Sequence, residues 1–223
     1  METWVNYLAE AGIKLDEHMP ERVEYFLNDL YDQNTVMNLT RVPREEAFTR
    51  HILDSLLFLD LIPEESEVLD LGTGAGFPAW PIALARPDVT VTALDSNGKM
   101  IGFLRRHQTF NMKIVQERIE TWPVREAFDV VTGRALAPLA IQMEVSAGPL
   151  VIGGHFIPMR TPGDLGVIPP VVAESLGLAL VAEHERPLPG TDVVRYFPVY
   201  RKVKATPERF PRSWAEIRRR PLA

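Results

Sequence analysis

Val68-Leu-Asp-Leu-Gly-Thr-Gly-Ala-Gly-Phe77 is a short apolar run that ends in three alternate glycines. This pattern predicts a strand, a glycine-rich turn and the first residues of a helix. Gly72, Gly74 and Gly76 allow the backbone to approach a ligand where a Cβ atom would collide with it. The helix start behind them offers free N–H groups. The stretch therefore predicts a site for a nucleotide-like ligand.

Asp95 accompanies this turn, because it ends the next apolar run 19 residues after Gly76. A carboxylate at that spacing can accept hydrogen bonds from both hydroxyls of a ribose. Dinucleotide sites favour G-x-G-x-x-G, and in that register Phe77 stands where the third glycine belongs. Asp70 would repel a phosphate and attract a cationic amino-acid head. The pattern thus favours S-adenosylmethionine over NAD, with a purely structural turn as the remaining alternative.

Strand-like and helical stretches alternate after the turn, which predicts a parallel α/β sheet with helices on both faces. The last two strands have no long helix between them, so they are expected to pair antiparallel. The expected strands are Val68–Gly72, Val89–Asp95, Lys113–Gln116, Phe128–Thr132, Leu150–Met159, Leu178–Glu185 and Arg195–Val203, and the expected helices are Pro78–Ala85, Gly98–Phe110 and Leu139–Gly148.

The first sixty residues show a helical pattern instead. Apolar residues recur three and four positions apart over residues 17–33, which predicts a helix with one buried face and with Asp16 as its N-cap. A second helix is expected from Pro43 to Leu59. Both belong to an expected N-terminal helical extension.

The expected organisation is a helical extension at residues 1–62, an α/β domain at 63–204 and a basic tail at 205–223 that packs as an extended cover or not at all. Residues 200–223 carry a net charge of +6, whereas the first 199 residues carry −12. An acidic body with a basic tail suggests a polyanionic partner. The alternative is a solvated tail without a specific role.

Length and composition bound the class of protein. At about 150 residues per domain, 223 residues allow one large domain or one domain with a small extension. Apolar residues make up 46% and charged residues 24%, which excludes disorder as the main state. The absence of cysteine excludes a disulfide scaffold, a thiolate zinc site and a cysteine nucleophile. With no secretory signal and no apolar run near the ~20 residues of a membrane span, we expect a cytoplasmic protein.

Further motifs accompany the glycine stretch, namely Asn38-Leu-Thr40, Arg50-His-Ile-Leu-Asp-Ser55, Leu94-Asp-Ser-x-x-Lys99 with Phe103-Leu104, and Gly133-Arg-Ala135. Their order and spacing resemble the RsmG (GidB) family from about residue 5 to residue 203. The tail, Thr206-Pro-x-x-Phe-Pro-Arg212 with Pro221-Leu222, resembles the ending of many members. That family methylates N7 of one guanine in small-subunit ribosomal RNA with S-adenosylmethionine.

The resemblance implies a class I (Rossmann-like) S-adenosylmethionine-dependent methyltransferase with an N-terminal helical extension, and the strand pattern adds an antiparallel last strand. It implies S-adenosylmethionine as cofactor and 16S ribosomal RNA of the small ribosomal subunit as substrate. Because the body is acidic, we expect the substrate to be an assembled ribonucleoprotein. We also expect a monomer that does not bind membranes.

The resemblance also assigns site residues. Gly72 and Phe77 would contact the cofactor, Asp95 would hold the ribose, and the backbone at Ile119 and Glu120 would meet the adenine. Arg134 would lie beside the cofactor and the target base and is the expected catalytic residue. The whole expected cofactor site is Asp70, Gly72, Gly74, Gly76, Phe77, Asp95, Ile119, Glu120 and Arg134.

The chain departs from the family at Arg160-Thr161, where the fifth strand usually ends in Lys-Gly. Arginine keeps the charge but not the compact ammonium geometry. We expect Arg160, Arg209 and Arg212 to bind the substrate, and each contact with a phosphate adds salt dependence. The alternatives are a surface charge at Arg160 and solvated arginines in the tail.

His51 and Asp54 lie three residues apart and could be mistaken for metal ligands. Two ligands do not make a site, so we expect no metal and expect Asp54 to cap or pair locally. For Arg134, the alternative to a substrate contact is a salt bridge to a neighbouring acid such as Asp129.

Guanine N7 carries an in-plane lone pair and no proton, so the implied reaction needs no general base. Two other functions remain open from the residues. One is a methyltransferase that acts on a different acceptor. The other is a non-catalytic S-adenosylmethionine-binding protein with an assembly or regulatory role. A nicotinamide reductase is a more distant alternative, because Phe77 interrupts the dinucleotide pattern.

Overall fold

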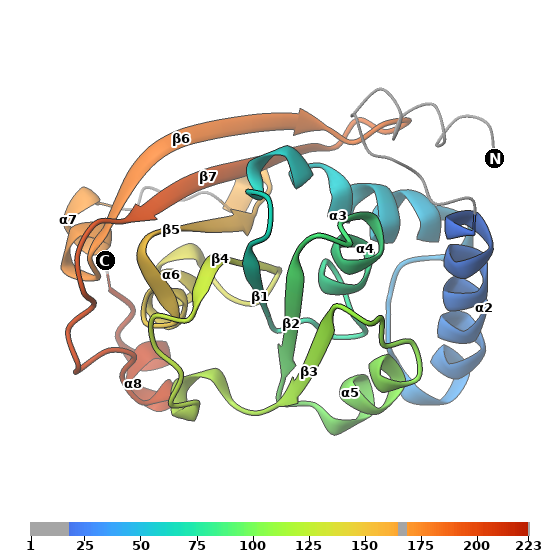
Figure 1. Cartoon of the computed structure of the whole chain (residues 1–223), viewed down its shortest axis with the longest axis horizontal. Helices are drawn as coiled ribbons and strands as arrows, with labels where there is room; N and C mark the ends of the chain where they lie inside the picture. Colours follow the sequence, from blue (N-terminus) through green and yellow to red (C-terminus); the bar gives the residue numbers. More distant parts are fainter. Residues whose placement is uncertain (1–17, 165–168, 223) are drawn as a thin grey trace.

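One mixed sheet of seven strands lies at the centre of the computed structural model, which describes residues 18–164 and 169–222 (Figure 1). The strands are β1 Glu67–Leu71, β2 Thr90–Asp95, β3 Met112–Gln116, β4 Phe128–Arg134, β5 Leu150–Met159, β6 Leu178–Pro187 and β7 Val194–Lys202. The helices are α2 Met19–Met37, α3 Asp54–Leu56, α4 Ala79–Ala85, α5 Gly98–Arg105, α6 Leu139–Ala147, α7 Pro170–Ser175 and α8 Trp214–Arg219. Shorter turns of helix lie at Arg44–Glu46, Phe48–Leu53, Leu59–Leu61, Ile119–Thr121 and Pro162–Asp164. The expected N-cap Asp16, like most of the segment inspected for a secretory signal, lies outside the described residues.

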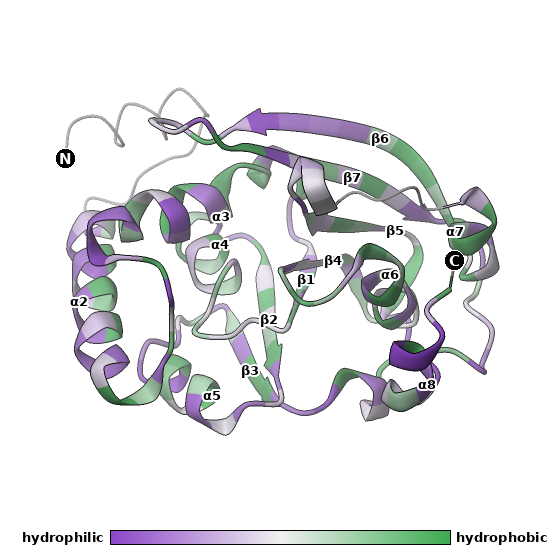
Figure 2. Ribbon diagram, turned by 180° about the vertical axis from the view of Figure 1, so that it is seen from behind, coloured by the Kyte–Doolittle hydropathy of each residue, from purple (hydrophilic) through white to green (hydrophobic). Residues whose placement is uncertain are grey.

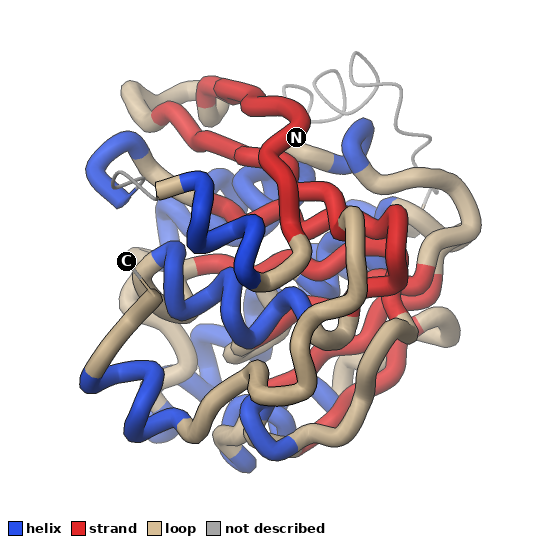
Figure 3. The backbone as a smooth tube through the Cα atoms, turned by 90° about the vertical axis from the view of Figure 1, so that its left-hand side faces the viewer, coloured by secondary structure: helices blue, strands red, loops and turns tan. Residues whose placement is uncertain are grey.

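The strand order is β3-β2-β1-β4-β5-β7-β6. Val68 of β1 pairs in parallel with Val91 of β2 and with Val130 of β4. Strand β7 lies between β5 and β6 and is antiparallel to both. In Figures 1 and 3 the two strands of the β6–β7 hairpin lie next to each other above the remaining strands. The predicted parallel sheet with antiparallel last strands is confirmed. The chain winds outward from β1 to β3 and returns to β4, so the carboxyl ends of β1 and β4 flank the place where such sheets bind ligands.

Helices cover both faces of the sheet, as predicted, and adjacent residues of one strand serve different cores. Val68 packs with apolar residues of α2, α3, α4 and α5. Leu69 packs instead with α6, α7 and α8. Figure 2 shows the apolar colours concentrated along the central strands, whereas α8 is largely hydrophilic. Alternation of side chains along a strand explains how five-residue β1 anchors two separate cores.

Helix α2 is attached to the sheet domain through aromatic packing. Phe26 is fully buried and stacks on Trp80 of α4, with ring centroids 4.0 Å apart and an interplanar angle of 23°. The Phe77 ring meets the Phe26 ring edge-on, with the two ring centroids 5.6 Å apart. The predicted buried face of this helix is thus confirmed, and Phe26 is its central contact with the residues that follow the glycine turn.

The second predicted helix, Pro43 to Leu59, is not one continuous helix. It consists of a 3₁₀ turn at Arg44–Glu46, a π-helix at Phe48–Leu53, the short α3 and a further 3₁₀ turn at Leu59–Leu61. Three polar residues, His51, Asp54 and Ser55, are buried along it. Apolar spacing predicts only the helical tendency of such a segment. In this segment the buried His51, Asp54 and Ser55 lie where the backbone changes from a π-helix to an α-helix.

The tail was expected to pack as an extended cover or not at all. It packs on the sheet domain, but it is not extended throughout, because helix α8 lies within it. Phe210 and Ile217 are buried in the core that also contains α6. Helix α8 begins with a capping box, in which Ser213 and Glu216 exchange side-chain and backbone hydrogen bonds. The Ser-x-x-Glu spacing is a sequence signal for this helix that the composition of the tail obscures. Helix α7 is also absent from the predicted elements.

Within the ranges that the structure describes, none of the helices combines the length and the apolar character needed to cross a membrane.

Truncation of Phe26 tests the attachment of α2. Phe26→Ala is expected to lower the free energy of unfolding by about 3–5 kcal/mol, because it removes a fully buried ring and leaves a cavity beside Trp80. Val36→Ala, on the same helix but 73% exposed, is expected to change it by less than about 0.5 kcal/mol. Urea unfolding followed by circular dichroism measures both. Equal effects of the two variants would contradict the assigned contact.

Candidate functional site

The glycine turn links the carboxyl ends of β1 and β2. The backbone N–H of Gly72 donates to the Leu94 carbonyl at 2.9 Å, and the N–H of Thr73 donates to the same oxygen at 3.1 Å. Gly72 has a φ of 70°, and a Cβ atom there would lie 2.5 Å from Cδ1 of Leu136. Both the left-handed backbone and the close approach of Leu136 require glycine at this position.

Asp95 ends β2 and faces the turn. Its Oδ2 accepts a hydrogen bond from the Gly74 N–H at 2.9 Å, and its Oδ1 accepts one from the Asn97 N–H at 2.8 Å. The side chain is half-buried. Two backbone donors therefore fix the orientation of the carboxylate, whose remaining lone pairs are available to hydroxyl donors.

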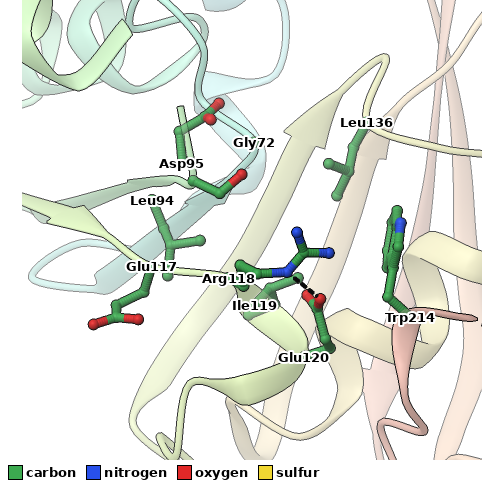
Figure 4. A pocket seen from close by; sticks show the side chains of 10 residues that line it. Gly72, Leu94, Asp95, Glu117, Arg118, Ile119, Glu120, Leu136 and Trp214 are labelled. Atoms are coloured by element: carbon green, nitrogen blue, oxygen red, sulfur yellow. Dashed lines mark hydrogen bonds and ion pairs between the residues drawn. The ribbon is translucent and has the colours of Figure 1, made fainter. Parts of the chain in front are cut away.

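A cavity of about 240 Å³ opens beside this carboxylate (Figure 4). Four of the expected cofactor residues line it, namely Gly72, Asp95, Ile119 and Glu120. The other lining residues are Leu94, Ser96, Glu117, Arg118, Leu136 and Trp214. The loop after β3 thus reaches the same cavity as the glycine turn. Trp214 is a lining residue that the sequence analysis did not identify.

The cavity is acidic. Asp95, Glu117 and Glu120 contribute three carboxylates, against the single guanidinium of Arg118. Arg118 Nε donates to Glu120 Oε1 at 2.5 Å, which holds that pair across the cavity floor. The net negative charge favours a cationic ligand and disfavours one with phosphates.

Asp70 does not line the cavity. It is completely buried, and its Oδ2 accepts a hydrogen bond from the Ala79 N–H at 3.1 Å, at the first residue of α4. Burial raises the pKa of Asp70 to about 7, although the Ala79 hydrogen bond acts in the opposite direction. Asp70 therefore lies behind the turn and connects β1 to α4. Its expected direct contact with a cofactor remains a prediction.

Phe77 also faces away from this cavity. Its ring stacks on His51 with centroids 4.2 Å apart and planes 7° from parallel. The Arg134 guanidinium lies 5.4 Å from the centre of the same ring. Phe77 thus forms part of the junction between the N-terminal helices and β4. Its expected contact with the cofactor remains a prediction, as do the contacts of Gly74 and Gly76.

Arg134, the last residue of β4, is held by three groups of the broken helical segment. Its Nη1 donates to the Arg50 carbonyl at 2.8 Å and to Asp54 Oδ2 at 3.2 Å, and its Nη2 lies 3.3 Å from Nδ1 of His51. The acid considered as its alternative partner, Asp129, instead accepts the Glu67 N–H at 2.9 Å. The salt bridge therefore exists, but with a different carboxylate.

Asp54 is completely buried between two arginines. Besides Arg134, it binds Arg195 of β7 in a bidentate manner, with Nε to Oδ1 at 2.7 Å and Nη2 to Oδ2 at 2.9 Å. The expectation that Asp54 caps or pairs locally is wrong, because its partners lie 80 and 141 residues away. Arg195 was missed, since no local pattern marks a partner at such a separation.

His51 is neutral in this arrangement. Burial, together with the charges of Arg134 and Arg50, lowers the pKa of His51 to about 3. Because a guanidinium only donates, Nδ1 of the neutral ring must accept from Arg134. The proton then lies on Nε2, which donates to Thr40 Oγ1 at 2.8 Å. His51 thereby orients Arg134 without adding a charge.

A second cavity lies on the other side of the loop that follows β4. Its lining residues are Val42, Arg50, Asp54, Arg134, Ala135, Met159, Thr161 and Arg195. Three arginines against one aspartate make it basic. A third cavity adjoins it and is lined by Ala135, Ala137, Pro138, Arg160 and Gly163. Ala135 has a φ of 53°, a left-handed conformation that is strained for a residue with a side chain.

The three arginines expected to bind the substrate occupy different environments. Arg160 is 5% exposed, lines the third cavity, and donates from Nη1 to the Ala137 carbonyl at 2.9 Å. It is therefore not a simple surface charge. Arg209 is exposed and lies over the Phe210 ring. Arg212 is only partly exposed and forms an ion pair with the completely buried Glu144, so it is not a free solvated charge.

The part of the chain that the structure describes contains no cluster of three or more histidine, aspartate or glutamate side chains that could hold a metal ion.

Comparison with known sequences gives near full-length matches. The model of the GidB family, described as rRNA small subunit methyltransferase G, matches residues 19–163. A ribosomal RNA small subunit methyltransferase G from Macrococcus caseolyticus is 32% identical, over 98% of this chain and 97% of that protein. The protein of the same name from Lachnoclostridium phytofermentans is 34% identical over 99% and 96%, and that from Chloroflexus aggregans is 34% identical over 95% and 93%.

Comparison with solved structures supports the fold. The M. jannaschii TYW2 complex with AdoMet aligns with a TM-score of 0.56 at 15% identity, over 68% of this chain and 76% of that chain. A SAM-dependent methyltransferase from Aquifex aeolicus aligns with a TM-score of 0.53 at 14% identity, over 70% and 92%. At these identities the likeness is one of architecture, and it agrees with the predicted class I fold.

The raised pKa of Asp70 predicts a pH-dependent stability. The folded state retains the Asp70 proton up to about pH 7, whereas the unfolded chain loses it near 3.8, so the free energy of unfolding falls as pH rises between these values. Asp70→Asn keeps an acceptor for the Ala79 N–H without a charge. It is expected to raise the melting temperature by several degrees at pH 8, and by less at pH 5.

Thermal unfolding by differential scanning calorimetry at the two pH values measures this difference. Asp192→Asn, a change of the same kind at an exposed position, is expected to leave the melting temperature unchanged at both. An equal gain for Asp70→Asn at pH 5 and pH 8 would show that the buried carboxyl is ionised at both values and would contradict the raised pKa.

Proposed function

Because this chain belongs to the GidB family, the rRNA small subunit methyltransferase G family, we propose that it transfers the methyl group of S-adenosylmethionine to N7 of a guanine in 16S ribosomal RNA. One observation carries the proposal. Two cavities of opposite charge lie on the two sides of the loop 135–138, at the carboxyl end of β4. The acidic cavity suits a cationic cofactor, and the basic one suits a nucleic acid.

The acidic cavity fits S-adenosylmethionine, which is a sulfonium with an amino-acid head. Asp95 would accept hydrogen bonds from the two ribose hydroxyls, because its carboxylate is already oriented by two backbone N–H groups. Ile119 and Glu120 would border the adenine. Asp70, Gly74, Gly76 and Phe77 would act by shaping the turn from behind. A dinucleotide phosphate would instead meet three carboxylates, which favours the sulfonium ligand.

S-adenosylmethionine supplies an electrophilic methyl group when it is bound. The N7 lone pair of guanine lies in the plane of the base and carries no proton, so no residue of the chain has to remove one. The residues have only to align the two ligands and exclude water. Alignment of this kind can supply roughly 7–11 kcal/mol of a reaction barrier.

Arg134 would hold the target guanine. Arginine usually donates to both O6 and N7 of guanine, but a donor on N7 would block the reacting lone pair. We therefore propose that Arg134 donates to O6 or to the adjoining phosphate and leaves N7 free. Its fixed position, set by Asp54, the Arg50 carbonyl and His51, supports this role.

The remaining arginines divide into two groups. Arg195 and Arg160 line the basic and the adjoining cavity, and we propose that they contact RNA beside the target base. Arg209 is exposed and would contact RNA phosphates. Arg212 was expected to do the same, but its ion pair with Glu144 favours an anchoring role for it.

The partner would be the assembled small ribosomal subunit, because an acidic body weakens binding to free RNA. We propose that the enzyme acts as a monomer in the cytoplasm. We also propose that residues 63–204 form the methyltransferase domain and that residues 1–62 form an N-terminal extension, whose described part, from residue 18 onward, lies beside the target side. Two contacts support this assignment of domains. Helix α2 packs on α4, and the Arg50–Asp54 segment binds Arg134 at the end of β4.

Methyl transfer from labelled S-adenosylmethionine to unmodified small ribosomal subunits tests the function. The label is mapped by N7-specific strand cleavage, and one labelled guanine in 16S ribosomal RNA is expected. Free 16S ribosomal RNA serves as the comparison and is expected to be a poorer substrate. Cofactor binding without any transfer to the subunit would overturn the proposed acceptor and favour another substrate or a non-catalytic role.

Asp95 gives a specific prediction for the cofactor side. Asp95→Asn is expected to raise the Kd for S-adenosylmethionine by about 10- to 100-fold, because a hydrogen bond to a charged group contributes roughly 1.5–3 kcal/mol. Isothermal titration calorimetry measures the Kd. Asp88→Asn, at the opposite end of β2, is the matched control and is expected to bind like the unmodified protein. An unchanged Kd for Asp95→Asn would place the ribose elsewhere.

A further inference from the structure

The C-terminal segment is anchored beside the acidic cavity by partly buried polar contacts. Arg212 donates to Glu144 from Nε at 2.9 Å and from Nη2 at 2.6 Å, and its backbone N–H donates to Glu144 Oε1 at 2.9 Å. Arg125 donates to the carbonyls of Thr206 at 3.0 Å and Phe210 at 2.9 Å. Glu144 is completely buried in α6, so the ion pair holds the tail on the sheet domain at a fixed point.

These anchors determine where Trp214 lies. The ion pair at Arg212 is followed directly by the capping box of Ser213, so the helix α8 starts at a defined position. Ile217, completely buried one turn later, fixes the rotation of the helix. Trp214 is the first residue of α8, and the same arrangement directs its half-buried indole toward the acidic cavity (Figure 4).

Inside the cavity, Trp214 lies across from Asp95 and next to Leu136, with the Arg118–Glu120 pair below (Figure 4). The Asp95 carboxylate lies at the end of β2, whereas Leu136 and Trp214 form an apolar wall across from it (Figure 4). A ligand that fills this space therefore meets polar acceptors on one side and a flat aromatic surface on the other. An adenosyl group has this division, with ribose hydroxyls at one end and an apolar base face at the other.

We propose that α8 is a wall of the cofactor pocket and that Trp214 stacks on the adenine of S-adenosylmethionine. The inference rests on the proposed function, because it assumes that this cavity takes the adenosyl group. Stacking by Trp214 would give the tail a role in cofactor binding, which the basic charge of the tail does not suggest. Arg212 and Glu144 are positioning residues in this arrangement, since they act through Trp214.

Cofactor affinity of Trp214 variants tests the inference. Stacking of a base on an aromatic side chain contributes about 1–3 kcal/mol on substitution by alanine, so Trp214→Ala is expected to raise the Kd for S-adenosylmethionine about 5- to 150-fold. The Kd for adenosine should rise by a similar factor. Trp214→Phe keeps an aromatic face and should stay within about threefold of the unmodified protein. Arg218→Ala, at an exposed position of the same helix, is the control without effect.

Tryptophan fluorescence provides a second measurement that does not depend on the alanine variant folding well. S-adenosylmethionine should quench the emission of the unmodified protein, and Trp214→Phe should lose this quenching while it still binds in calorimetry. Arg212→Ala should raise the Kd, and it should add little in the Trp214→Ala background, because the two residues act through one contact.

The outcomes separate the two proposals. If the unmodified protein binds S-adenosylmethionine and folded Trp214→Ala has the same Kd, the role of Trp214 is overturned and the proposed function stands. Retained quenching in Trp214→Phe would also overturn it. If the unmodified protein binds no S-adenosylmethionine, the proposed function fails, and this inference fails with it.

Discussion

The carboxylate of Asp54, withdrawn from water between Arg134 and Arg195, is the interaction on which the site depends. It joins three segments that are distant in the chain, namely the broken helical segment, the end of β4 and the antiparallel β7. Without the Asp54 carboxylate the two partly buried guanidinium groups would lose their shared counterion, so the three segments depend on one another. The N-terminal residues are in this way part of the site and not a separate addition to the sheet.

Two ligand environments follow from this assembly. The loop after β4 has the acidic cavity on one side and the arginine-lined cavity on the other, and its residue Leu136 occupies the space that a Cβ of Gly72 would need. A cationic methyl donor and an anionic acceptor could thus be brought together without either crossing a region of like charge. Short-range packing of one loop keeps the two regions separate.

The strands, the parallel sheet with its antiparallel last pair and the glycine turn could be predicted from the sequence, because strands and turns are specified by neighbouring residues. Gly72 and Asp95 meet in one cavity as their positions at strand ends imply, and Ile119 and Glu120, which the family resemblance assigned to the site, line the same cavity. The partners of Asp54 and the contribution of Trp214 could not be predicted. Each depends on residues more than 60 positions apart, and no local periodicity records such a contact. The basic composition of the tail even suggested a solvated segment, whereas the buried Glu144, the hydrogen bonds from Arg125 and the buried Phe210 and Ile217 hold it in place.

The neutral state of His51 has a consequence for the electrostatics of the target side. With its pKa near 3, this ring stays uncharged at every pH at which a cell operates, and arginines do not lose their protons there. His51 and the arginines therefore contribute the same charge to this cavity when the acidity of the surroundings changes. Dissolved salt remains the physical variable that tunes its attraction for an anionic partner, through screening over about 10 Å at 0.1 M ionic strength.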